Sequence, residues 1–239
     1  NFFKEKFNEI KLEQILIEST ISSLLEASLF GIDSHGVNLF GHYYDCLLSG
    51  RIKKGTKLDL KIKGSCITCD AKNNLANYAA KNVINELELL SNKNGIAIAS
   101  IKNCDHIGAV GIHGVNSNIK NKLIFGFTNA DALAVTPDGK SVIFGTNPIS
   151  LIFKSTENFL YIDLATTKFS MNKVKNYRRQ NKELPQNFAR DKYLRTTINP
   201  KEANFLEPIG NHKGFALAYL VEIMTSGLSG QDHSYDLMP

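Results

Sequence analysis

Apolar residues recur with the period of a helix in several stretches of the chain. Leu12, Leu16 and Leu24 share one face of a helix predicted over residues 11–30, and Gly31 follows where a C-terminal cap belongs. Further helices are predicted over residues 37–50, 75–92, 108–118 and 215–224.

Other stretches have the pattern of β-strands. Leu58, Leu60 and Ile62 alternate with Asp and Lys, which is typical of a half-buried strand. Apolar runs predict strands over residues 95–101, 123–128, 149–153 and 160–164. Strands alternate with helices and then cluster, which predicts an α/β fold with a mixed sheet. Because helices precede the first strand, we expect a helical unit over 1–55 and a mixed-sheet region over 56–239.

The composition of the 239 residues is that of a soluble globular protein. Hydrophobic residues make up 43% and charged residues 21%, which excludes collagen, low-complexity and disulfide-scaffold classes. No apolar run reaches the roughly 18 residues of a membrane span, and no signal peptide opens the chain. We therefore expect a cytoplasmic protein with no membrane partner.

The four cysteines do not form a disulfide framework, which favours a reducing compartment. Cys66 and Cys69 form a CxxC, but no second CxxC and no HxxxH supplies the further ligands of a zinc site. The pair lies in a strand-like stretch, where residues three apart point to opposite faces. We interpret both as small half-buried residues and predict no metal site.

The net charge is +5, from 28 Lys and Arg against 23 Asp and Glu. Basic residues concentrate only between Lys173 and Arg195. Such a run is typical of a solvated loop, and the weaker alternatives are a clamp for a cofactor phosphate and an RNA-binding patch. Few aromatic residues are interleaved with these charges, so we expect no nucleic-acid partner.

One glycine motif resembles a dinucleotide fingerprint without matching it. Gly108, Gly111 and Gly114 follow a buried strand and open a helix. A Rossmann fold needs GxGxxG, because the second glycine lets the backbone approach the pyrophosphate, whereas the spacing here is GxxGxxG. We therefore predict a sheet that is not of the Rossmann type.

Polar motifs at the ends of the predicted elements supply the candidate chemistry. Ser34 and His35 lie before a helix, whose N-terminus lowers the pKa of an imidazole and attracts anions. His106 lies just beyond the C-terminal end of a buried strand, the edge at which α/β sheets bind ligands. The remaining motifs contain Thr146 and Asn147 in GTNP, Asp163, Leu164 and Ala165 in DLATT, and His212 and Lys213 in NHKG.

In this order the motifs GIDSHGVNLF, NCDHIGAVG, PDGKSVIFGTNPIS, DLATT and HKGFALAYLVEIMTSGLSG resemble the type-2 malate/L-lactate dehydrogenase family. That family also includes ureidoglycolate dehydrogenase, sulfolactate dehydrogenase, diketogulonate reductase and piperideine-carboxylate reductase. The resemblance runs from about residue 20 to residue 230. It implies an L-sulfolactate dehydrogenase-like, non-Rossmann fold, a homodimer, and an NAD(P)-dependent oxidoreductase that interconverts a small 2-hydroxy acid and its 2-oxo acid. Family members continue past residue 239, so a C-terminal segment is expected to be missing.

The resemblance also implies a role for each motif. Ser34 and His35 match the catalytic Ser-His, with His35 as the proton donor, and His106 matches a second histidine used for acid–base work. Cofactor contacts are implied at Gly108, Thr146, Asn147, Asp163, Leu164, Ala165, His212 and Lys213.

Some residues depart from the family pattern. Leu39 stands where many members carry an Arg that grips the substrate carboxylate, and Leu cannot form that bidentate contact. Ala130 replaces a serine found in some members, and Lys173 lies near an acidic residue of the imine reductases. The first two departures motivate an alternative, a nicotinamide-binding protein of the same fold without turnover. Since neither Lys213 nor Lys173 marks a site for a 2′-phosphate, we expect NAD as the cofactor, with NADP possible.

Overall fold

Two units make up the computed structural model, which describes residues 2–237. The first unit contains the chain up to Gly126 together with Leu151–Ile162. The second contains Phe127–Ser150 and the chain from Asp163 onward. The predicted boundary between residues 55 and 56 stays a prediction.

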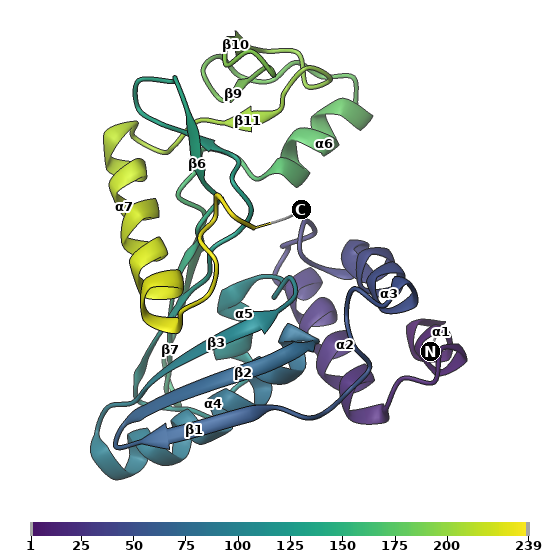
Figure 1. Cartoon of the computed structure of the whole chain (residues 1–239), viewed down its shortest axis with the longest axis vertical. Coiled ribbons are helices and arrows are strands. Elements are labelled where there is room, and N and C mark those ends of the chain that lie inside the picture. The colour runs from purple at the N-terminus through teal and green to yellow at the C-terminus, as the bar shows by residue number, and fades with distance from the viewer. Residues whose placement is uncertain (1, 238–239) are drawn as a thin grey trace. The chain divides into compact units, whose positions relative to one another are not determined.

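Helices α1 (Phe2–Glu9), α2 (Gln14–Leu29) and α3 (Phe40–Ser49) begin the first unit (Figure 1). Their core includes Phe7, Leu16, Ile17 and Tyr43, whose side chains have no exposed surface. The predicted cap after α2 is confirmed. Gly31 has a φ of +73°, and the N–H of Ile32 donates to the carbonyl of Ala27 at 2.8 Å.

A three-stranded mixed sheet follows in the same unit. β1 (Asp59–Lys63) is antiparallel to β2 (Cys66–Asn74), and β2 is parallel to β3 (Ile98–Cys104). Helix α4 (Ala76–Asn94) connects the two parallel strands, as a parallel pair requires. On β2, Cys66 is exposed and Cys69 is buried, so the predicted opposite orientation of the CxxC pair is confirmed, whereas the interpretation of both as half-buried is wrong.

The first unit also contains α5 (Val110–Val115) and most of a second three-stranded sheet. The strands of that sheet are β4 (Leu123–Phe127), β7 (Ile149–Lys154) and β8 (Phe159–Leu164), in the order β4-β7-β8.

The second unit contains a five-stranded mixed sheet of short strands in the order β10-β9-β11-β5-β6. These strands are β5 (Ala134–Val135), β6 (Val142–Phe144), β9 (Ala189–Arg190), β10 (Thr196–Thr197) and β11 (Phe205–Leu206). Helix α7 (His212–Glu222) continues into a π-helical turn, Ile223–Gly227. The β1-β2-β3 sheet and the five-stranded sheet each contain parallel and antiparallel strand pairs, so the predicted mixed α/β fold is confirmed.

The prediction of a solvated loop between Lys173 and Arg195 is wrong for its first part, which forms helix α6 (Met171–Arg179). The Oγ of Ser170 caps α6 by accepting a hydrogen bond from the N–H of Lys173 at 3.2 Å. Val174 is fully buried in a core with Leu184 and Leu206. This apolar contact stabilises the helix, although most of its other side chains are charged or polar.

Three arginines of this stretch have partners within the protein. Arg190 Nε pairs with Glu207 Oε1 at 2.6 Å, and Arg195 pairs with Asp191 at 2.8 Å. Arg178 donates two hydrogen bonds to the carbonyl of Pro200. Because these guanidinium groups already have partners, the stretch is a poor phosphate-binding surface.

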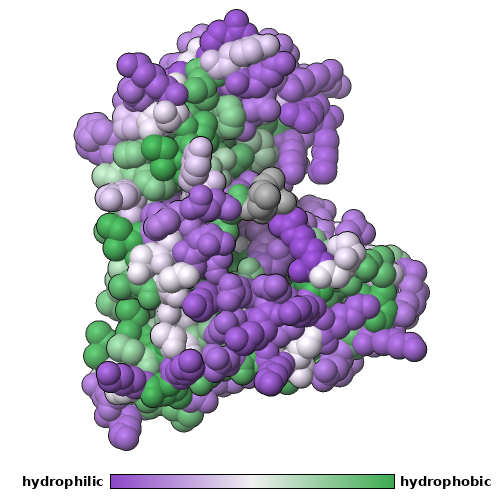
Figure 2. Space-filling view, in the orientation of Figure 1, coloured by the Kyte–Doolittle hydropathy of each residue, from purple (hydrophilic) through white to green (hydrophobic). Residues whose placement is uncertain are grey.

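Apolar side chains are exposed along α7, where Figure 2 shows a band of hydrophobic residues. They include Leu217, Tyr219, Leu220 and Ile223, each at least 37% exposed. Among residues 2–237, no helix is both long and apolar enough to cross a membrane.

Candidate active site

The Ser34–His35 motif lies in a tight loop between α2 and α3. The N–H of His35 donates to the carbonyl of Ile32 at 2.9 Å, and the N–H of Val37 donates to Ser28 Oγ at 3.0 Å. The first bond closes a turn within the loop, and the second ties the loop to α2. The backbone is therefore held by hydrogen bonds at His35 itself and at Val37, two residues further on.

The structure brings His35 beside His106, which follows β3. The two imidazole rings stack with their centroids 5.6 Å apart and their planes 11° apart. Two of the three predicted catalytic residues thus meet although they come from distant parts of the chain. The third, Ser34, lies in the same loop, with its Oγ 2.8 Å from Nδ1 of His35.

Backbone geometry fixes the protonation of His106. The N–H of Gly108 donates to Nδ1 of His106 at 3.2 Å. A backbone N–H can only donate, so Nδ1 carries no proton and the neutral ring has its proton on Nε2. The turn depends on Gly108, whose φ of +79° is a region that other residues rarely adopt.

His35 is under a different constraint. Its Nδ1 faces a serine hydroxyl, which can either accept or donate a hydrogen bond. When the ring is protonated, Ser34 Oγ can accept a hydrogen bond from Nδ1–H. It can accept the same bond from the neutral tautomer that has its proton on Nδ1 and none on Nε2. Of the two histidines, His35 is thus the one whose hydrogen bond is compatible with gaining and losing a proton.

Both histidines are shifted toward their neutral form. Burial lowers the pKa of His35 below its ordinary value of 6.5. The surrounding protein atoms, together with the neighbouring His35 and His42, lower the pKa of His106 to about 4, although the residue is exposed at the surface. At neutral pH both rings are therefore uncharged.

Tyr43 fixes the position of His106 through a hydrogen bond, a role that the sequence did not reveal. Its side chain is fully buried, and its hydroxyl donates to the carbonyl of His106 at 2.9 Å. Burial raises the pKa of the Tyr43 phenol, so it stays a hydrogen-bond donor. His42 lies against the same imidazole, with ring centroids 5.9 Å apart, and was also missed.

In the second unit, backbone hydrogen bonds join the GTNP, DLATT and HKG motifs. The N–H and the hydroxyl of Thr166 donate to the carbonyl of Thr146 at 2.9 and 3.0 Å. The carbonyl of Thr166 accepts from Ile209, whose own carbonyl accepts from Gly214 at 2.7 Å. The structure thus groups the segments that carry Thr146, Asp163–Ala165 and His212–Lys213.

The start of α7 has the chemistry of a phosphate site. His212 and Lys213 are exposed, and no acidic residue lies in the first turn. The N–H groups of Lys213 and Gly214 already donate to the carbonyls of Gly210 and Ile209, so the charged side chain of Lys213 is the group that remains for a phosphate. These residues fit a dinucleotide phosphate.

Gly214 makes this grouping possible, which gives a first testable prediction. A Cβ at Gly214 would lie 2.3 Å from the carbonyl oxygen of Ile209 and 2.8 Å from that of Thr166. Gly214→Ala should therefore lower the free energy of unfolding by about 1–3 kcal/mol or more, as overpacking does. Urea unfolding measures this.

The matched control is Gly227→Ala, because a Cβ there would meet only the side chain of Ile223, at 3.8 Å. Equal unfolding midpoints for the two variants would contradict the packing argument.

Asn147 is bound into the protein core instead of facing outward. Its Nδ2 donates to the carbonyl of Ala218 at 3.1 Å and to Glu222 Oε2 at 2.9 Å. Its Oδ1 accepts from the N–H of Ala130 at 3.3 Å. With its side chain fully bonded inside, Asn147 could reach a cofactor only through its backbone.

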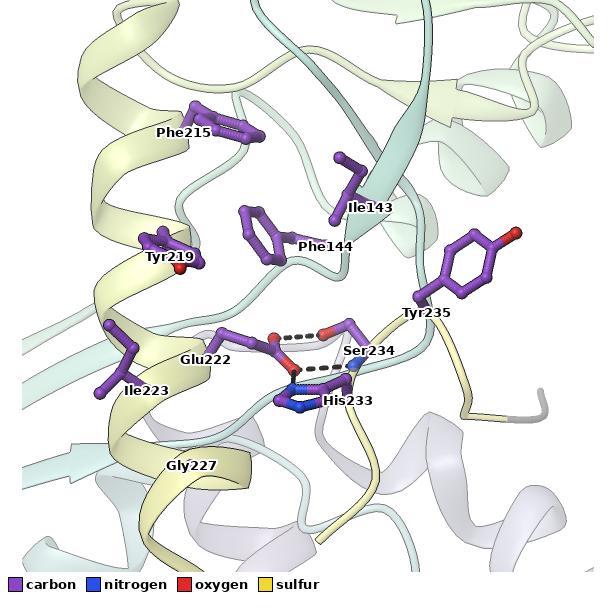
Figure 3. A pocket seen from close by; sticks show the side chains of 10 residues that line it. All are labelled: Ile143, Phe144, Phe215, Tyr219, Glu222, Ile223, Gly227, His233, Ser234 and Tyr235. Atoms are coloured by element: carbon purple, nitrogen blue, oxygen red, sulfur yellow. Dashed lines mark hydrogen bonds and ion pairs between the residues drawn. The ribbon is translucent and has the colours of Figure 1, made fainter. Parts of the chain in front are cut away.

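Glu222 is the centre of this internal network (Figure 3). The carboxylate is buried and accepts from the N–H and hydroxyl of Ser234 at 2.7 and 2.6 Å and from Ser226 Oγ at 2.9 Å. Burial alone would raise the pKa of Glu222, but the hydrogen bonds from Ser234, Asn147 and Ser226 outweigh burial and hold it below 4.5.

A hollow of about 430 Å³ lies beside this network in the second unit. Figure 3 shows its aromatic wall, formed by Phe144, Phe215 and Tyr219. None of the predicted site residues lines it. The predicted residues are instead grouped by the histidine stack in one unit and by the backbone links in the other.

A protein-family model described as malate/L-lactate dehydrogenase matches residues 1–238. The malate/(S)-sulfolactate dehydrogenase of Methanothermus fervidus is 28% identical over 213 residues, which cover 87% of this chain and 62% of that protein. The malate dehydrogenase of Pyrococcus abyssi is also 28% identical, over 87% of this chain and 60% of its own length. The chain therefore spans about three fifths of the length of these relatives.

Solved structures share the fold. The malate dehydrogenase of Entamoeba histolytica superposes with a TM-score of 0.90 at 23% identity, over 97% of this chain and 69% of that chain. The sulfolactate dehydrogenase of Methanocaldococcus jannaschii superposes with a TM-score of 0.83 at 25% identity, over 96% and 67%. The predicted sulfolactate dehydrogenase-like fold is thereby confirmed.

Proposed function

The chain belongs to the malate/L-lactate dehydrogenase family, and from that membership we propose that it interconverts a small 2-hydroxy acid and its 2-oxo acid with a nicotinamide cofactor. Relatives named as dehydrogenases of malate, sulfolactate and ureidoglycolate support this class of substrate. The observation that carries the proposal is the stack of His35 on His106, because oxidation of an alcohol requires a group that removes the hydroxyl proton.

We assign the proton transfer to His35. In the oxidation direction its neutral Nε2 takes the hydroxyl proton, while Nδ1–H donates to Ser34 Oγ. The lowered pKa of His35 keeps Nε2 free at neutral pH. In the reduction direction the protonated ring returns that proton to the substrate oxygen.

His106 has a different role in this proposal. With its proton fixed on Nε2, it donates a hydrogen bond to the substrate oxygen and polarises it. Tyr43 and Gly108 position its ring from the backbone side. The bound cofactor supplies or accepts the hydride.

The cofactor contacts proposed are Gly108, Thr146, Asn147, Asp163, Leu164, Ala165, His212 and Lys213. The positive charge of the exposed Lys213 side chain supports binding of the cofactor phosphates. Lys173 does not favour NADP, because its Nζ lies over the Phe169 ring, 4.4 Å from the centroid.

The test is turnover of a panel of 2-hydroxy acids, malate, lactate, sulfolactate and ureidoglycolate, with NAD and with NADP, followed at the nicotinamide absorbance. We expect at least one substrate to be oxidised. Cofactor binding by titration without any turnover would instead support the alternative, a nicotinamide-binding protein that lost catalysis, for which Leu39 and Ala130 are the motive.

We predict that NADH is the preferred reductant. The measurement is kcat/KM for NADH and for NADPH on one 2-oxo acid, and a tenfold advantage for NADPH would overturn the prediction.

A homodimer is also proposed. Its support is the exposed apolar face of α7, since large exposed apolar patches commonly mark protein interfaces. Light scattering that gives a monomer mass at every concentration would reject it. A cytoplasmic location remains part of the proposal.

A further inference from the structure

Three potential metal ligands converge beside Tyr43. His42 and Cys46 lie one turn apart on α3, and Asp105 follows β3. One ligand atom from each lies within 4.8 Å of the other two. The cysteine sulfur is 3.9 Å from His42 Nε2, and that nitrogen is 3.7 Å from Asp105 Oδ2.

These separations are close to those within a zinc site. Bonds of about 2.3 Å to sulfur and about 2.0–2.2 Å to nitrogen and oxygen place tetrahedral ligands roughly 3.3–3.6 Å apart. The two distances from His42 Nε2 exceed this by a few tenths of an ångström, and the cysteine sulfur lies within 4.8 Å of an Asp105 oxygen. His42 has a side chain that is 39% exposed, so its ring can turn to close the gap.

A second observation concerns Asp105 itself. Its Oδ2 is buried and has no hydrogen-bond partner among residues 2–237. Burying an acceptor without a partner is costly, and the atom faces His42. A bound cation would supply the missing partner.

The second oxygen of Asp105 is already engaged on the other side. Arg51 Nε lies 3.9 Å from Oδ1. At this distance the two groups form a long ion pair and no hydrogen bond. The guanidinium of Arg51 reduces the net negative charge of the three-ligand cluster. Ca²⁺ and Mg²⁺ prefer several oxygen ligands, so a cluster of one thiol, one imidazole and one carboxylate suits a metal that binds thiolate strongly.

We infer that His42, Cys46 and Asp105 form a binding site for one thiol-preferring divalent ion of the zinc class. Cys46 loses its proton to solvent when the ion binds. Three protein ligands leave a fourth position for water. The inference does not depend on the proposed dehydrogenase activity.

The test is titration of the 239-residue chain, kept reduced, with Co²⁺, which reports a thiolate ligand through a charge-transfer band. We expect a band that grows to one equivalent and is removed by Zn²⁺. Cys46→Ser should abolish the band, and His42→Ala should weaken affinity at least about tenfold, the lower limit seen even for outer partners.

Cys69→Ser is the matched control, because Cys69 is another buried cysteine of the first unit and lies outside the cluster. Its band should equal that of the unaltered chain. Absence of a band in the unaltered chain, or a band that survives in Cys46→Ser, would overturn the inference. Because His42 is partly exposed, its replacement tests the site even if Cys46→Ser does not fold.

Discussion

His35→Gln should lower kcat/KM for the hydroxy acid by about 10²–10⁴-fold, the usual contribution of an acid–base group. His106→Gln should cost only about tenfold, because the glutamine amide can still donate the hydrogen bond that we assign to Nε2. An amide has no pKa near neutral pH and cannot act as a general acid or base, so the same replacement affects the two stacked histidines differently. Steady-state kinetics of both variants on one substrate measures the difference.

The pH profile adds an independent readout. Oxidation requires neutral His35, so its kcat/KM should rise with pH through a pKa below 6.5 and then level off. That acidic limb should be absent in His35→Gln and retained in His106→Gln. If the acidic limb were lost in His106→Gln and retained in His35→Gln, the proton transfer would be assigned to His106 instead.

Glu222→Ala should lower the free energy of unfolding by about 2–6 kcal/mol. The N–H of Ser234 and the amide of Asn147 would each lose a buried acceptor, at about 1–3 kcal/mol each. Glu222→Gln should also lower the free energy of unfolding, because one of the two carboxylate oxygens is replaced by an NH₂ group. That group would face the N–H of Ser234 or the amide of Asn147, and two donors cannot form a hydrogen bond. Urea unfolding followed by circular dichroism measures both variants.

The exposed Glu183 provides the control, and Glu183→Ala should change the free energy of unfolding by less than about 0.5 kcal/mol. The pKa of Glu222 is depressed in the folded state, so its contribution is present above about pH 4.5 and is lost as the pH falls through the folded pKa. The difference between Glu222→Ala and the unaltered chain should therefore shrink in acid. If Glu222→Gln were as stable as the unaltered chain at pH 7, the network would not depend on a carboxylate.

Local patterns predicted the parts of the molecule that depend on near neighbours. The end of α2 at Gly31 and the opposite orientation of Cys66 and Cys69 follow from short-range periodicity and cap chemistry. Helix α6 was missed because its charges conceal a narrow apolar stripe, and Val174 is its one buried residue.

The site required contacts that no local pattern contains. Sequence motifs identified His35 and His106, but their stacking depends on how β3 and the α2–α3 loop pack. The cluster of His42, Cys46 and Asp105 was missed since a search for CxxC or HxxxH pairs does not detect a ligand from another element. Glu222 left no local signal, because neighbouring residues of a helix point about 100° apart and the apolar Val221 and Ile223 do not indicate which face Glu222 occupies.

The chain crosses between its two units after Gly126, after Ser150 and after Ile162. On the ribosome, strand β4 is therefore made before β7 and β8, its companions in the sheet. A nascent chain that ends near Gly126 has an unpaired strand with exposed Leu123 and Phe125, the kind of edge that aggregates or recruits chaperones. No single cut releases either unit whole, so protease fragments of this protein should not be treated as its folding domains.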